Sequence, residues 1–185
     1  MWKIYVYIRK NPKDNYGSER LEFPIADRKL ADFIKRIGND PNNTSVYVTD
    51  IIPKELACIS GQPLDLKEIN DFAKRMCNIG INDIITYHAA LEAYEPKTLA
   101  AAENILLNIS SYFLIGYGKS LTEMGCDYLK ACKGRVDSDD DPHKIGEKLM
   151  SEGKGIQTAH GYLFGKNCIN GRESHDHTDH STNEG

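Results

Sequence analysis

Residues 145–164 read I-G-E-K-L-M-S-E-G-K-G-I-Q-T-A-H-G-Y-L-F, and no other stretch indicates the scaffold so clearly. A short helix or turn is predicted over His143–Met150, and a strand that begins with a glycine over Gly155–Phe164. No serine or cysteine near His160 completes a nucleophile motif. The stretch therefore indicates a structural element rather than an active site.

The start of the chain alternates between apolar and polar residues, which is typical of strands. Strands are predicted over Trp2–Arg9, Arg20–Phe23 and Ser45–Ile51, with a helix over Asp27–Ile37 between the last two. The apolar face of that helix consists of Leu30, Phe33, Ile34 and Ile37. We therefore expect a small ββαβ subdomain over residues 1–62.

The middle of the chain has a helical period. Helices are predicted over Leu64–Asn78, over Asp83–Tyr94 and from Pro96 to Asn108, where the proline suits a first helical turn. The connections between them are short, and short connections place consecutive helices antiparallel. Residues 63–110 are therefore expected to form an antiparallel helical layer.

The last third of the chain is expected to form a third subdomain. An apolar strand is expected over Tyr112–Tyr117, and the pattern S-L-T-E at 120–123 is a capping box that opens a helix to about Cys132. Together with residues 145–164 this gives a C-terminal α/β subdomain over 111–166. The expected fold class is α+β, and residues 167–185, rich in histidine and aspartate, are expected to be disordered.

Composition favours a cytoplasmic protein without a membrane segment. No apolar run approaches the ~20 residues that a membrane helix needs, and the first residues lack the apolar core of a signal peptide. The chain has five cysteines and no C-x-x-C pair. An odd number of unclustered cysteines favours reduced thiols, buried as small hydrophobic residues, over disulfides or a zinc site.

Two loops have some features of ligand sites but lack essential ones. G-Y-G-K-S at 116–120 follows a strand and precedes a helix, as a phosphate-binding loop does, but Phe113 stands where that motif requires a glycine. D-S-D-D-D at 137–141 has the carboxylates of a calcium loop without its central glycine and closing glutamate. A turn and a solvated acidic loop are the better interpretations.

The histidines give no clear metal site from the sequence. His88 and Glu92 share one face of a predicted helix, but two groups do not make a site. His175, His177 and His180 have a spacing that binds transition metals weakly, in a segment with no predicted fixed geometry. We therefore expect no catalytic, cofactor-binding or metal-binding residues, and a protein that is not an enzyme.

Four stretches resemble the ArdA antirestriction family. They are residues 21–25 (L-E-F-P-I), the helix within 65–78, the helix of 120–134 with D-Y-L at 127–129, and the segment 145–164. In the last stretch the similarity is carried by Gly146, Leu149, Gly153, Thr158, His160, Gly161 and Tyr162. The resemblance implies an elongated arrangement of three subdomains, a homodimer, and inhibition of host type I restriction–modification enzymes by carboxylates that mimic DNA phosphates.

The charge pattern suggests two candidate surfaces. Residues 1–60 carry ten Lys or Arg against eight Asp or Glu, whereas the remainder is mildly acidic. The candidate acidic surface is Glu92, Glu95, Glu103, Glu123, Asp127, Asp137, Asp139, Asp140 and Asp141. The candidate basic surface is Lys10, Lys13, Arg20, Arg28, Lys29, Lys35 and Arg36.

The hypothesis that follows is an anti-defence protein of a mobile element or phage. It would bind and inhibit a host DNA-targeting nuclease, either a restriction–modification enzyme or a CRISPR nuclease. The alternative is a DNA-binding accessory protein of a mobile element, which would hold double-stranded DNA through its basic N-terminal surface.

Overall fold

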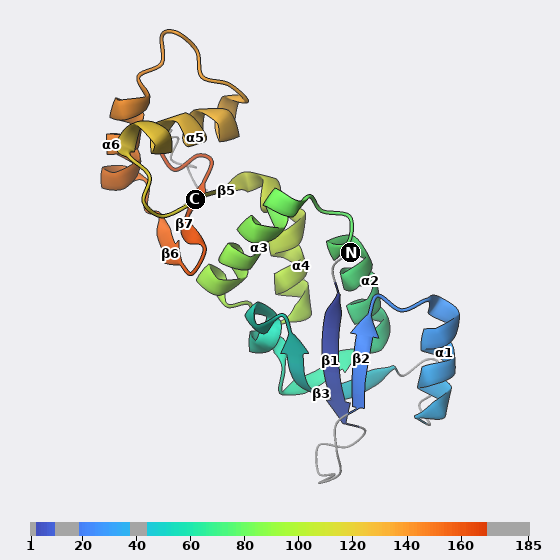
Figure 1. The fold of residues 1–185 in the computed structure, drawn as a ribbon. Helices are drawn as coiled ribbons and strands as arrows, with labels where there is room; N and C mark the ends of the chain where they lie inside the picture. Colours follow the sequence, from blue (N-terminus) through green and yellow to red (C-terminus); the bar gives the residue numbers. More distant parts are fainter. Residues whose placement is uncertain (1–2, 10–18, 38–43, 170–185) are drawn as a thin grey trace, which may run out of the picture.

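The computed structural model describes residues 3–9, 19–37 and 44–169, and it is an α+β protein, as predicted. Its described part is elongated: a four-stranded sheet lies at one end, helices fill the middle, and a small sheet with two helices forms the other end (Figure 1). The three groups of elements therefore follow one another along one long axis, in the order of the sequence.

The N-terminal sheet is antiparallel throughout, with strand order β2-β1-β3-β4. Its strands are β1 (Ile4–Arg9), β2 (Glu19–Phe23), β3 (Ser45–Ile52) and β4 (Gln62–Asp65), and α1 (Asp27–Arg36) lies between β2 and β3 in the chain. The expected ββαβ order is present. In addition, β4 pairs with β3 as far as Asp65, so the sheet extends beyond the end predicted at residue 62.

The short 3-10 helix η1 (Lys54–Ile59) lies between β3 and β4 in the chain and belongs to the N-terminal part. The middle of the molecule contains the helices α2 (Leu66–Met76), α3 (Ile81–Tyr94) and α4 (Leu99–Leu107). The prediction that Pro96 opens the third helix is wrong. Glu95 adopts a left-handed conformation that ends α3, and the Thr98 hydroxyl accepts the Ala101 N–H at 3.1 Å, which starts α4 later.

One hydrophobic core joins the N-terminal sheet to these helices. Long side chains fill it, among them Phe23 from β2, Phe72 from α2 and Tyr87 from α3, each at most 2% exposed. The Tyr87 hydroxyl donates to the carbonyl of Ala102 at 3.0 Å, which satisfies the only polar atom of that side chain. Burying a side chain of this size contributes about 1.5–3 kcal/mol to folding.

The C-terminal part combines η2 (Ile109–Ser111), β5 (Tyr112–Ile115), α5 (Leu121–Lys133), α6 (Pro142–Glu152), β6 (Ile156–Thr158) and β7 (Gly161–Gly165). The capping box at Ser120 and Glu123 is confirmed. The single strand predicted over Gly155–Phe164 is wrong: β6 and β7 form a hairpin that turns at Ala159 and His160, and the sheet order is β5-β7-β6.

Two glycines allow α5 and α6 to touch through their backbones. A Cβ atom on Gly125 would lie 1.8 Å from the carbonyl oxygen of Pro142, and one on Gly146 would lie 1.9 Å from that of Leu121. Real Cβ atoms do not approach this closely, so any larger residue would push the helices apart. Gly146, one of the residues that carries the ArdA resemblance, therefore has a packing role.

The small sheet is covered on both faces. Phe113, Ile115 and Phe164 belong to a second hydrophobic core with α5 and α6. Leu163, next to Phe164 on β7, and Leu114, between Phe113 and Ile115 on β5, pack into the larger core. Successive strand residues point to opposite faces, so the sheet lies between the two cores and contributes side chains to both. Because both of its faces are buried, its strands β5 and β7 are continuously apolar.

The cysteines are free thiols, as predicted, but they are not deeply buried: Cys132 is exposed and the other four are half-buried. Lys10, Lys13 and residues 170–185, which include the three tail histidines, lie outside the described residues. Among the residues that are described, no helix is long and apolar enough to cross a membrane.

Candidate functional site

The candidate acidic residues do not form a free anionic ribbon. Each of the nine either forms an ion pair with a side chain of the same chain or accepts a hydrogen bond from it. Five of them pair with Lys or Arg side chains: Glu95 with Lys97, Glu103 with Arg75, Asp127 with Lys119, Asp137 with Arg135, and Asp140 with Lys133. The other four accept from backbone N–H groups or serine hydroxyls: Glu92, Glu123, Asp139 and Asp141.

The described basic candidates gather on α1. Arg28, Lys29, Lys35 and Arg36 are exposed on this helix, and Arg20 lies on β2. Two of the five are already engaged: Arg36 pairs with Glu19 and lies 4.9 Å from the Phe33 ring centre, and Arg20 lies 5.1 Å from that of Tyr5. The α1 surface is therefore basic but only partly available for phosphates.

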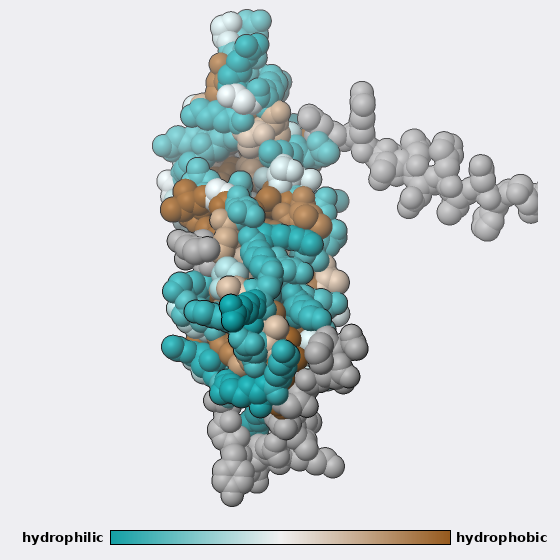
Figure 2. Space-filling model, turned by 90° about the vertical axis from the view of Figure 1, so that its right-hand side faces the viewer, coloured by the Kyte–Doolittle hydropathy of each residue, from teal (hydrophilic) through white to brown (hydrophobic). Residues whose placement is uncertain are grey.

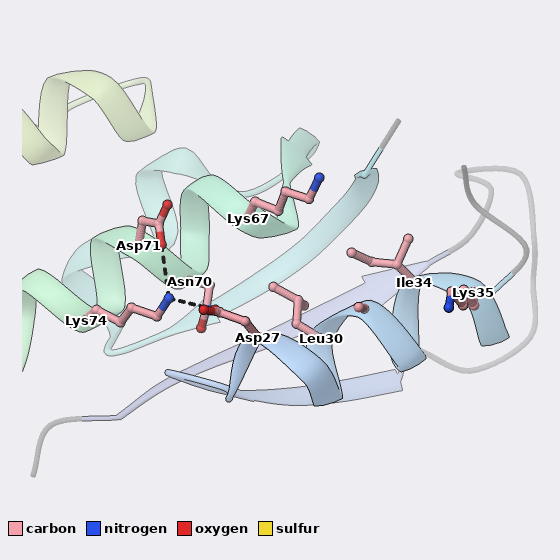
Figure 3. Close-up of a pocket in the computed structure, with 9 residues that line it drawn as sticks. Asp27, Leu30, Ile34, Lys35, Lys67, Asn70, Asp71 and Lys74 are labelled. Atoms are coloured by element: carbon pink, nitrogen blue, oxygen red, sulfur yellow. Dashed lines mark hydrogen bonds and ion pairs between the residues drawn. The ribbon is translucent and has the colours of Figure 1, made fainter. Parts of the chain in front are cut away.

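A groove between α1 and α2 encloses about 350 Å³ (Figure 3). Leu30 and Ile34 of α1 form its apolar side. Lys74 of α2 crosses the groove to pair with Asp27 of α1 at 2.7 Å, and it also pairs with Asp71 of its own helix at 3.3 Å. Such a groove can accept an apolar side chain of a partner. It holds no arrangement of acid, base and nucleophile among its lining residues.

A second cleft, of about 590 Å³, lies where the three parts of the molecule meet. Glu55 of η1 lies in it, and so does His160 of the β6–β7 turn; His88 of α3 lies beside them. The carboxylate of Glu55 lies 3.7 Å from His88 Nδ1 and 3.9 Å from His160 Nε2. The two imidazole rings meet edge to face at 6.0 Å.

The turn that carries His160 is held by several contacts. The Thr158 hydroxyl donates to the Gly161 carbonyl at 3.0 Å and accepts the His160 N–H at 3.2 Å. Both Glu92 carboxylate oxygens accept the Ala159 N–H, at 2.8 and 2.9 Å, which docks the turn on α3. Gly161, at φ 137°, lets the turn approach the Ile115 carbonyl where a Cβ atom would clash at 2.3 Å.

Burial sets the electrostatics of this cleft. It lowers the pKa of His88 by disfavouring the charged ring, and this outweighs the opposite influence of the Glu55 carboxylate. Burial likewise raises the pKa of the Cys58 thiol, against the attraction of Lys97. His88 is therefore neutral at pH 7 and Cys58 is a protonated thiol, not an activated nucleophile.

No protein-family model, no curated protein and no solved structure matches this chain. Sequence reasoning singled out His88 and His160 separately but not Glu55, and it did not bring the three together. His88 could be singled out because it is a histidine on the apolar face of a predicted helix. His160 could be singled out because Thr158 and Gly161 flank it. Glu55 has no such local signal.

Proposed function

We propose that this protein is a non-enzymatic inhibitor of a host DNA-targeting nuclease, which it binds directly. The target class is a type I restriction–modification enzyme or a CRISPR nuclease. The observation that carries the proposal is the layout: an N-terminal sheet, a helical layer and a C-terminal sheet follow one another along an elongated molecule (Figure 1). This is the arrangement that the resemblance to ArdA proteins implies.

The charges favour direct contact with the nuclease over plain DNA mimicry. A mimic competes for a cationic groove by displaying carboxylates that, like DNA phosphates, carry only exchangeable counterions and are not paired with fixed cations of the same molecule. Here five of the nine acidic candidates pair with a Lys or Arg of the same chain. The mixed surface that results supports recognition of one specific partner.

Exposed hydrophobic side chains supply a candidate contact surface, which we call the apolar patch. It consists of Ile81 (77% exposed), Ile85 (45%) and Leu107 (65%), from the start of α3 and the end of α4, two helices that lie side by side (Figure 1). One face of the molecule also shows groups of hydrophobic residues at mid-height, with hydrophilic residues between and around them (Figure 2). Exposed apolar side chains with polar residues around them are typical of protein interaction sites.

The test is a DNA-cleavage assay with purified type I restriction enzymes and CRISPR nucleases. We expect the protein to stop cleavage by at least one of them, at a fixed molar ratio to the enzyme. Replacing Ile81 and Leu107 together by serine should weaken inhibition by about fivefold or more, as hot-spot losses exceed about 1 kcal/mol. Met150→Ser, on α6 and 53% exposed, is the matched control and should inhibit normally.

Protection of DNA from none of these nucleases would reject the proposal. Equal inhibition by the wild type and the double-serine variant would reject the apolar patch as the contact while leaving inhibition itself in place. Thermal unfolding of both variants checks that they fold like the wild type.

DNA binding through α1 is the second candidate function, favoured by four exposed basic side chains on one ten-residue helix. A mobility-shift assay at low salt tests it. A shift that weakens steeply with added salt, and that is lost when Arg28 and Lys35 become glutamine, would support it. Asp27 and Asp32 on the same helix oppose it.

A further inference from the structure

The cleft between the three parts of the molecule brings together ligand types that suit a metal ion. Glu55 comes from the N-terminal part, His88 from the helical layer and His160 from the C-terminal hairpin. Their side chains are 12%, 11% and 30% exposed. One potential ligand atom from each lies within 4.8 Å of the other two.

The distances fit a metal centre after small side-chain movements. Ligands bound at about 2.0–2.1 Å in a tetrahedral site lie about 3.3 Å from one another. Glu55 is already 3.7 Å from His88 and 3.9 Å from His160 between the nearest atoms. Metal binding would require side-chain rotations that close this remaining difference.

The chemistry of the set selects the metal class. Imidazole nitrogens suit Zn²⁺, Fe²⁺, Ni²⁺ and Cu²⁺, whereas Mg²⁺ and Ca²⁺ prefer oxygen ligands. Two histidines and one carboxylate are a recurrent set for zinc and non-haem iron. Glu92 and Glu95 line the same cleft and add negative charge, which Lys54 partly offsets.

We propose that Glu55, His88 and His160 bind one divalent transition-metal ion of the zinc class, which ties the three parts of the molecule together. Three protein ligands leave one coordination position, and the cleft admits water to it. The Glu92 contact to Ala159 positions the turn that carries His160, as outer-shell partners do in metal sites. This inference does not rest on the proposed inhibition of a nuclease.

The experiment is a Zn²⁺ titration by calorimetry on the full chain. The three histidines at 175, 177 and 180 are first replaced by asparagine, because they can bind Zn²⁺ themselves, and this protein is the reference. We expect the reference to bind one equivalent of Zn²⁺, and a large excess of Mg²⁺ not to compete. Absence of saturable binding, or equal competition by Mg²⁺, would overturn the proposal.

His160→Asn in the reference chain is the main variant, because this side chain is the most exposed of the three and Thr158 and Glu92 hold its turn. Its Zn²⁺ affinity should fall by at least about tenfold, since even outer-shell losses cost metal sites about 10–100-fold. Glu55→Gln should give a comparable loss. His143→Asn, an exposed histidine on α6 that faces Glu147, is the matched control and should bind as the reference does.

Two further measurements distinguish a specific metal site from non-specific metal binding. Co²⁺ bound to the reference should show the visible absorption of a low-coordinate nitrogen and oxygen site, and His160→Asn should lose it. Zn²⁺ should raise the thermal unfolding midpoint of the reference and leave that of His160→Asn unchanged. Unchanged affinity, spectrum and midpoint shift in His160→Asn would overturn the assignment of these ligands.

Discussion

The two hydrophobic cores of this molecule are built in different ways. The larger core, which the N-terminal sheet shares with α2–α4, is filled by long side chains such as Phe72 and Tyr87. The smaller core lies under α5 and α6, whose backbones touch at Gly125 and Gly146. The first should therefore be most sensitive to the loss of atoms, and the second to their addition.

Removing a large side chain should have the greatest effect on the larger core. Phe72→Ala is expected to lower the free energy of unfolding by about 3–5 kcal/mol, because it leaves a cavity around a side chain that is 2% exposed. Urea denaturation measures this loss. Phe72→Leu, which keeps most of the volume, should cost clearly less, and a similar loss in both variants would contradict cavity formation as the cause.

Adding one methyl group should damage the smaller core. Gly146→Ala is expected to cost about 3 kcal/mol, since its Cβ would lie 1.9 Å from the Leu121 carbonyl oxygen and the helices must separate. Gly116→Ala is the control, because a Cβ there meets nothing within 4 Å. If both alanine variants unfold at the same urea concentration, the backbone contact between α5 and α6 does not hold this core together.

The link between the two regions can be weakened at Glu92. This side chain, on α3, accepts the backbone N–H of Ala159 in the β6–β7 turn. Glu92→Ala should cost about 1 kcal/mol and speed hydrogen exchange in β6 and β7, while amides of β1 and β3 stay protected. Glu95→Ala is the comparison, since Glu95 only pairs with the exposed Lys97. Exchange in the hairpin that is equal in the two variants would argue against docking through Glu92.

The smallest expected effect is a pH dependence of the stability of α5, the helix that covers the smaller core. The backbone N–H and hydroxyl of Ser120 lower the pKa of Glu123 in the folded state. A lowered folded pKa gives stability that is present above the ordinary glutamate pKa of about 4.3 and is lost as the pH falls through the folded value. The melting temperature of the wild type should therefore fall more, between neutral and acidic pH, than that of Glu123→Gln. Parallel curves would contradict this.

Local sequence signals predicted most of the fold. The S-L-T-E pattern at 120–123 specifies a helix start by side chains three residues apart, and alternation in β1 specifies which side chains face the core. The hairpin of β6 and β7 was missed because Ala159 and His160 are not residues typical of tight turns, whereas Thr158 and Gly161, which stabilise the turn, flank them.

The cleft could not be predicted in the same way. Glu55, His88 and His160 each belong to a different part of the molecule, so their proximity depends on how those parts pack. The acidic candidates show the same limit: the sequence contains both Glu103 and Arg75, but only the packing of α2 against α4 makes them an ion pair.

The small sheet has a mechanical consequence for the whole molecule. Leu163 and Phe164 are neighbours on β7, yet each packs in a different core. A rotation of one end of the molecule against the other would therefore disturb the packing of at least one of them. We therefore expect the small sheet to resist such a rotation and to hold the span between α1 and α6. A partner that contacts both ends would gain avidity without a cost of straightening a flexible chain.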